Sequence, residues 1–135
     1  GNPSADLMFV LLAPVKQDDD AGQICSGEAD ALFTKMLAAI GIDIQDVYIT
    51  SLLKCCVPQN HTVSPREISL CNEHLKQQVA LVQPKRVIVL GEVAIQCLLQ
   101  KPQSIDSFRS EINTAAGLNP PVANPLVAMP LFVSY

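Results

Sequence analysis

The chain has 135 residues, 49% of them hydrophobic and 16% charged, which is enough to bury the core of a single domain over residues 1–135. Its formal net charge of −4 at pH 7 excludes a globally basic nucleic-acid binder and leaves room only for a local basic patch. Five cysteines, an odd number, favour reduced thiols in a cytoplasmic protein over a disulfide framework. The apolar run 7–15 is too short to span a bilayer and has no basic leader, so we expect neither a membrane segment nor a secretory signal.

The first half of the chain predicts a strand, a loop and a helix. Residues 7–12 form a continuous apolar run, as expected of a strand that is buried on both faces of a parallel sheet. Residues 16–27 contain three consecutive aspartates and show no hydrophobic period, so they are predicted to form a long loop. From residue 29 to Ile40 apolar side chains recur at helical spacing, and Gly41 suits the end of that helix because glycine tolerates a positive φ.

The same order of strand and helix follows in the middle of the chain. Residues 47–53 are predicted to form the second strand. The sequence Ser64-Pro65-Arg66-Glu67 then supplies an N-cap serine, a proline at the first helical position and a glutamate placed for a capping box. Cys71 lies on the apolar face of this helix, so it is either a small core residue or a ligand.

The last part of the chain predicts two more strands. Residues 86–90 form the third, and a short helix after Gly91 is expected to turn Val93, Ala94, Cys97 and Leu98 inward. Residues 126–133 form the fourth. Alternating strands and helices predict an α/β fold, a three-layer sandwich around a four-stranded parallel sheet with right-handed crossovers. Such sheets bind ligands at the carboxyl ends of their strands.

Four segments of the chain together carry a family resemblance. They are ADLMFVLLAP, the acidic loop with AGQICSG, FTKMLAAIGIDIQDVYITSLLKCCVP, and SPREISLCNEHLKQQVALVQPKRVIVLGEVAIQCLL. In this order they resemble the uracil-DNA glycosylase superfamily, and most of all its iron-sulfur family four. The resemblance implies a base-excision repair hydrolase that flips deoxyuridine out of DNA into a pocket at the strand ends, where water attacks the anomeric carbon.

The family's first motif, Gly-Glu-Ala/Gly-Pro-Gly, places the start of the site. Ala13 and Pro14 match it and are expected to line the substrate pocket, whereas Leu12 replaces the glutamate and Val15 the second glycine. Since leucine cannot orient water, the resemblance leaves Asp18, at a later acidic position of the motif, as the catalytic candidate. The alternative for Asp18 is an ordinary solvated run of three aspartates.

The resemblance also places the residues that hold the base. The family's stacking phenylalanine falls at Cys25, whose thiol is a poor platform for a base. The asparagine that recognises uracil falls at Ser51, which lacks the paired donor and acceptor of an amide. We expect both to bind substrate with weakened base recognition. The family's terminal histidine would follow Tyr135, and neither His61 nor His74 obviously replaces it.

Two cysteines match half of the family's metal site. Cys55 and Cys71 correspond to two of its four [4Fe-4S] ligands, and Cys56 is an additional thiol. The other two ligands would precede Gly1, so the resemblance implies a cluster in a full-length form and none in this chain. The alternative is that Cys55 and Cys71 are buried thiols that no longer bind a cluster. A zinc site of Cys55, Cys56 and His61 lacks the usual two-residue spacing.

Two functions from different classes remain open. The first is a uracil-DNA glycosylase acting on uracil-containing or single-stranded DNA, with its missing residues beyond the ends of this chain. The second is a non-catalytic module on the same scaffold that associates with DNA or with other replication or repair proteins, as a small clamp-loader subunit of the bacterial replisome does. Interior substitutions at Leu12, Val15, Cys25 and Ser51 favour the second. Several side chains near the expected cleft are candidates for phosphate contacts: Lys54, Gln59, Asn60, His61 and Arg66.

Overall fold

The fold is given by a computed structural model, which describes residues 1–58, 60–91 and 93–94. Strands and helices alternate along these ranges, as the sequence predicts. In chain order the elements are β1 (Leu7–Leu11), α1 (Lys16–Ala21), α2 (Glu28–Ala39), the 3₁₀ helix η1 (Ile44–Asp46), β2 (Val47–Ser51), α3 (Pro65–Val82) and β3 (Arg86–Val89).

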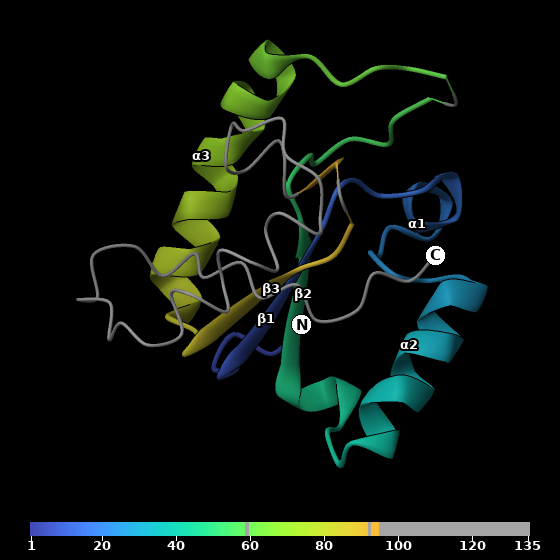
Figure 1. The fold of residues 1–135 in the computed structure, drawn as a ribbon, viewed down its shortest axis with the longest axis vertical. Helices are drawn as coiled ribbons and strands as arrows, with labels where there is room; N and C mark the ends of the chain where they lie inside the picture. The colour runs from blue at the N-terminus through green and yellow to red at the C-terminus, as the bar shows by residue number, and fades with distance from the viewer. Residues whose placement is uncertain (59, 92, 95–135) are drawn as a thin grey trace, which may run out of the picture.

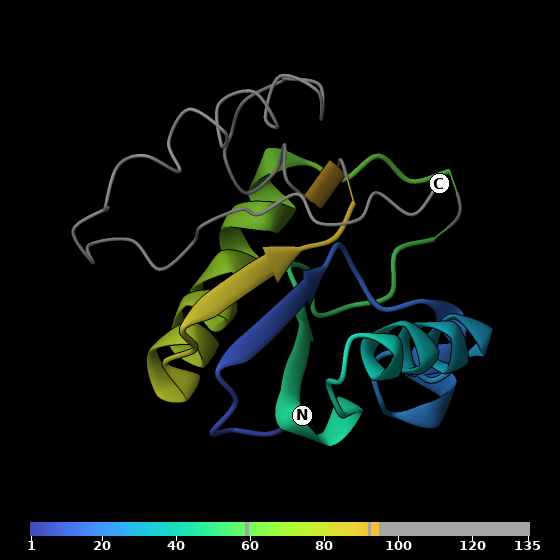
Figure 2. The same ribbon diagram turned by 60° about the horizontal axis from the view of Figure 1, so that its bottom comes forward.

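The described strands form one parallel sheet in the order β2-β1-β3, with Leu7 of β1 opposite both Val47 of β2 and Arg86 of β3. Helix α3 lies on one side of this sheet and α2 on the other (Figure 1), so the predicted α/β layering is confirmed. All three strands point to the same end of the sheet (Figure 2). The fourth strand predicted at 126–133 lies outside the described residues. Within the described part of the chain, no helix is both long and apolar enough to cross a bilayer.

Alternate side chains of β1 build a core on each face of the sheet. Met8 and Val10 are fully buried and belong to the cluster under α3, where they join Leu75 of that helix. Phe9, between them in the sequence, belongs to the cluster under α2. Burying a side chain such as Leu75 contributes about 2 kcal/mol to folding. The continuous apolar run of β1 therefore reflects burial on both faces.

The cluster under α2 is built around an aromatic pair. The rings of Phe9 and Phe33 are 4.9 Å apart between centroids and meet edge to face at 84°. Leu37 and Val47 complete the buried part of the cluster. Gly41 has a φ of 76°, which confirms that the chain after this helix takes the left-handed turn predicted for a glycine.

Helix α3 starts as its sequence predicts. Ser64 is the N-cap, Pro65 is the first helical residue, and the side chain of Glu67 completes the capping box. Gln83, with a φ of 50°, ends the helix. Pro84 follows directly and cannot continue a helix.

Two details of the prediction are wrong. Residues 16–27 do not form a continuous loop, because α1 occupies Lys16–Ala21. Asp18, in its first turn, accepts a hydrogen bond from the amide of Val15, and Gly22 ends the helix with a φ of 64°. Val93 is not directed inward but is 49% exposed, whereas Ala94 is fully buried as expected. Cys97 and Leu98 lie outside the described residues.

Candidate functional site

Three of the predicted site residues lie at the carboxyl edge of the sheet. Ala13 and Pro14 follow Leu12 after the end of β1 and are half-buried. Ser51 is the last residue of β2 and is only 3% exposed. Because the strands are parallel and adjacent, their ends share one edge, which is where open α/β sheets bind ligands.

Pairing between the first two strands continues beyond their last residues. The amide of Leu52 donates to the carbonyl of Leu11 at 2.8 Å, and that of Leu53 donates to Leu12 at 2.9 Å. Leu12 is half-buried and packs against the cluster under α3. The residue that replaces the family's glutamate therefore contributes to core packing, and the two turns at this edge are held together by backbone hydrogen bonds.

Asp18 is not part of a solvated charge run. Its side chain is buried, at 5% exposure, whereas Asp19 and Asp20 are exposed. One carboxylate oxygen, Oδ1, accepts hydrogen bonds from the amide of Ser26 at 2.7 Å and from its hydroxyl at 3.0 Å. The other, Oδ2, accepts from the amide of Val15 at 3.0 Å. Asp18 thus joins α1 to the segment before α2.

These contacts keep the Asp18 carboxyl ionised. Burial by itself raises its pKa, but hydrogen bonds from the backbone amides of Ser26, Val15 and Cys25 and from the Ser26 hydroxyl outweigh burial, and the net pKa lies below the usual value. An ionised carboxylate only accepts hydrogen bonds, about two for each oxygen. Within the described residues, the carboxylate therefore accepts from donors both before and after α1.

Cys25 lies in the short segment between α1 and α2. Its backbone has a φ of 61°, which is unusual for a residue other than glycine, asparagine or aspartate. Burial and the carboxylates of Asp30 and Asp18 raise the pKa of the thiol to about 11. The thiol is therefore protonated at neutral pH. It can touch a base as a small neutral group but cannot act as a nucleophile.

The side chain of Ser51 is already engaged within the protein. Its hydroxyl donates to the carbonyl of Leu53, two residues along the chain. The oxygen keeps a lone pair that can accept a hydrogen bond. Ser51 can thus accept from a base at this edge, but it does not supply the additional donor that an asparagine amide would.

A polar cluster between β2 and α3 is a feature that the sequence interpretation missed. The amine of Lys54 donates to Oε1 of Gln78 at 2.7 Å and to the hydroxyl of Thr50 at 2.9 Å, and its third acceptor is the carbonyl of Ser51. The amide group of Gln78 also donates to the Tyr48 hydroxyl at 3.4 Å. The signal in the sequence was Gln78 itself, a polar residue beside the buried face of an amphipathic helix.

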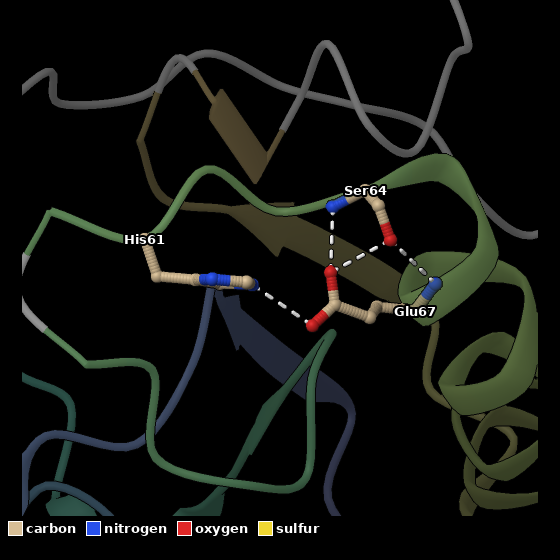
Figure 3. Close-up of polar contacts among 3 residues, drawn as sticks. All are labelled: His61, Ser64 and Glu67. Atoms are coloured by element: carbon tan, nitrogen blue, oxygen red, sulfur yellow. Dashed lines mark hydrogen bonds and ion pairs between the residues drawn. The ribbon is translucent and has the colours of Figure 1, made fainter.

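A second polar group joins the loop after β2 to the first turn of α3 (Figure 3). One oxygen of Glu67 accepts from the amide and the hydroxyl of Ser64, both at 2.7 Å, and the other lies 2.9 Å from Nε2 of His61. The hydrogen bonds from the Ser64 backbone and hydroxyl, and then the one from His61, lower the pKa of Glu67 to about 2. Since an ionised carboxylate cannot donate, Nε2 of His61 carries the proton. Ser64 donates to Glu67 rather than to His61, so these residues do not form an activated serine nucleophile.

The cysteines do not form a complete metal site in the part of the chain that is described. Cys55 is exposed, and Cys56 and Cys71 are half-buried; all are free thiols. No group of three or more cysteine, histidine, aspartate or glutamate side chains gathers as potential ligands within the described ranges. An iron-sulfur cluster needs about four thiolates, so these residues by themselves do not fit one.

A cavity of about 710 Å³ lies beside the segment that contains Cys25. It opens between the first residues of the chain, the segment after α1, helix α2 and the amino half of β2. Its lining residues are Gly1, Asn2, Pro3, Gly22, Gln23, Ile24, Asp30, Thr34, Ile44, Gln45, Val47 and Ile49. None of the site residues predicted from the sequence is among them.

The architecture is that of an α/β sandwich with a candidate ligand site at the carboxyl edge of its parallel sheet. Residues 1–132 match the family described as the Uracil DNA glycosylase superfamily, and the chain belongs to this family. It is 40% identical to a Type-4 uracil-DNA glycosylase of Archaeoglobus fulgidus over 96 residues, which cover 71% of this chain and 48% of the relative.

Other relatives extend the comparison. A Type-4 uracil-DNA glycosylase of Thermotoga maritima is 34% identical over 110 residues, covering 81% of this chain and 57% of that protein. A DNA polymerase of Bacillus phage SP01 is 26% identical over 118 residues, or 87% of this chain and 13% of the polymerase. The chain spans about half the length of the curated glycosylases that it matches.

Proposed function

We propose that the protein containing this chain removes uracil from DNA by hydrolysis of the N-glycosidic bond, in base-excision repair. The observation that carries the proposal is the buried, ionised carboxylate of Asp18 in the helix that follows β1, in a chain of the uracil-DNA glycosylase superfamily. The similarity to Type-4 uracil-DNA glycosylases supports the same reaction.

In the proposed reaction, the bond between the anomeric carbon and N1 of uracil breaks, and the bonding electrons leave with the base as a uracil anion. A water oxygen bonds to the anomeric carbon and loses a proton, and uracil takes up a proton after it departs. In this reaction Asp18 accepts a hydrogen bond from the water, and its negative charge stabilises the cationic sugar. Ala13 and Pro14 supply the adjacent wall of the pocket.

In the proposed complex, Ser51 accepts a hydrogen bond from the base but donates none to it. Ser51 accepts a hydrogen bond from the N3–H of uracil, because its own proton is donated to Leu53. Cys25 contacts the ring as a neutral thiol and supplies less stacking area than an aromatic side chain. We therefore propose that this site holds uracil more weakly than a site with phenylalanine and asparagine. Cys55 and Cys71 supply two of about four thiolates that a [4Fe-4S] cluster needs, so no step is assigned to a cluster.

The test is release of uracil from single-stranded and double-stranded oligonucleotides by the full-length protein. We expect release from wild type, and a rate for Asp18→Asn that is lower by about 100-fold or more, as is typical when one electrostatic group is removed. Asp19→Asn is the matched control, because Asp19 is exposed in the same turn of α1. Absence of release from wild type, under conditions in which a reference glycosylase is active, would contradict the proposal.

A further inference from the structure

Lys54 directs its charge into the protein. An ammonium group has three donor hydrogens, and the three acceptors of Lys54 are Gln78 Oε1, Thr50 Oγ1 and the Ser51 carbonyl. Each hydrogen therefore has its own acceptor. A lysine that bound a phosphate would have to give up at least one of these bonds.

The three acceptors come from two elements. Thr50 and Ser51 are the last residues of β2, whereas Gln78 lies in the second half of α3, 24 residues beyond Lys54. Thr50 is 4% exposed, and its hydroxyl also donates to Gln78 at 2.8 Å. The ammonium group therefore joins the end of a strand to the helix that covers it.

The residues that follow Ser51 pair with the neighbouring strand. Directly after Ser51, the amides of Leu52 and Leu53 donate to the carbonyls of Leu11 and Leu12 at the end of β1. Leu52 is fully buried and Leu53 is 5% exposed. Holding the Ser51 carbonyl in place thus also holds the backbone that leads into the candidate pocket.

The electrostatic environment of Lys54 agrees with an internal role. Burial lowers the pKa of its amine, and the nearby thiol of Cys71 partly offsets that effect. All three of its hydrogen-bond acceptors are uncharged oxygens. In contrast, Arg66 in the first turn of α3 is exposed, and His61 is paired with Glu67.

We propose that Lys54 is a positioning residue, which fixes the carboxyl ends of β2 and β1 from inside the protein and does not contact DNA phosphate. Only the statement about phosphate rests on the proposed function. The statement about the strand ends concerns the folded chain and can be tested whether or not the protein acts on DNA.

The first experiment measures amide hydrogen exchange in the full-length protein. In Lys54→Met we expect the amides of Leu52 and Leu53 to exchange about tenfold or more faster, while the amides of Phe9 and Val10 change much less. The matched control is Lys85→Met, which removes the same charge from an exposed pair with Asp6 before β3. Equal acceleration at all four amides, or no change at Leu52 and Leu53, would overturn the proposal.

Gln78→Leu provides a second route to the same answer. It removes the acceptor on α3 and leaves Lys54 in place, so it decides the question even where Lys54→Met does not fold. We expect the same local acceleration, and the double variant Lys54→Met/Gln78→Leu to resemble the stronger single variant, because both changes break the bond between Lys54 and Gln78. A double variant whose fold-change equals the product of the two single effects would contradict a shared role.

The second experiment measures the salt dependence of DNA binding. Each phosphate contact contributes about 0.9 to the slope of log K against log salt on duplex DNA. We expect Lys54→Met to keep the wild-type slope and Arg66→Met to lower it. A slope lowered by about 0.9 in Lys54→Met would overturn the statement about phosphate. Absence of DNA binding by wild type would contradict the proposed function. The exchange result would still decide the positioning role of Lys54.

Discussion

The carboxylate of Asp18 accepts two hydrogen bonds from a single residue, Ser26, through both its backbone amide and its hydroxyl. This pair joins α1 to the segment that precedes α2. Replacing Asp18 with alanine would leave these donors and the amide of Val15 without their acceptor. We expect Asp18→Ala to lower the free energy of unfolding by about 2 to 3 kcal/mol, since hydrogen bonds to charged groups contribute in this range.

Urea denaturation measures this change, and Asp19→Ala is its control. Asp19 is exposed in the same turn, so its substitution should change stability by no more than about 0.5 kcal/mol. Equal losses in the two variants would mean that the charge of α1, and not the contact with Ser26, is responsible.

The same carboxylate makes stability depend on pH. The pKa of Asp18 is lower in the folded chain than the value of about 3.9 for an unfolded aspartate. Its stabilising contribution is therefore fully present above about pH 4 and is lost as the pH falls through the folded pKa. Thermal denaturation of wild type and Asp18→Asn should show a difference in stability that shrinks as the pH falls below about 4. A difference that grows on acidification would contradict the direction of this shift.

The capping box of α3 gives a prediction about a single hydroxyl. The side chain of Ser64 accepts from the amide of Glu67 at 3.3 Å and donates to its carboxylate at 2.7 Å. We expect Ser64→Ala to cost about 1 kcal/mol, as is usual for loss of an N-cap. Ser69→Ala, at an exposed position in the same helix, should not destabilise the protein. Similar unfolding midpoints in urea for Ser64→Ala and wild type would show that the cap is dispensable.

Thiol reactivity tests the environment of Cys25. Its raised pKa of about 11 leaves little thiolate near neutral pH, so alkylation should be slow there and faster at the exposed Cys55. Asp30→Asn removes a carboxylate that raises this pKa and should speed the reaction of Cys25 without changing that of Cys55. Mass spectrometry of the alkylated peptides over time gives both rates. Alkylation of Cys25 as fast as that of Cys55 in wild type would contradict the prediction.

The sheet and its covering helices could be predicted because their signals are local or periodic. The apolar run of β1 and the capping box of α3 each specify an element through neighbouring residues. Helix α1 was missed because it is only six residues long and its apolar positions show no period. Its start depends on the contact of Asp18 with the amide of Val15, which the three consecutive aspartates do not reveal.

The site was only partly predictable, because its hydrogen bonds join residues that are distant in the sequence. Family resemblance pointed to Asp18 and Ser51, of which Ser51 ends β2 and Asp18 lies in the helix that follows β1. What these side chains bind depends on residues distant in the sequence or in other elements. The bond from Lys54 to Gln78 spans 24 positions, and the one from Ser26 to Asp18 spans 8. A motif aligns residues along the chain, but it does not show which hydrogen bonds are already made inside the fold.

The packing of Leu12 bears on which residues its position can accept. At the position where the family's first motif has a glutamate, this leucine packs against the hydrophobic cluster under α3. A glutamate at this position would bring a charge against apolar side chains, at a cost in folding stability. The fold therefore accommodates an ionised acid at Asp18, whose carboxylate accepts hydrogen bonds from amides, and disfavours one at position 12.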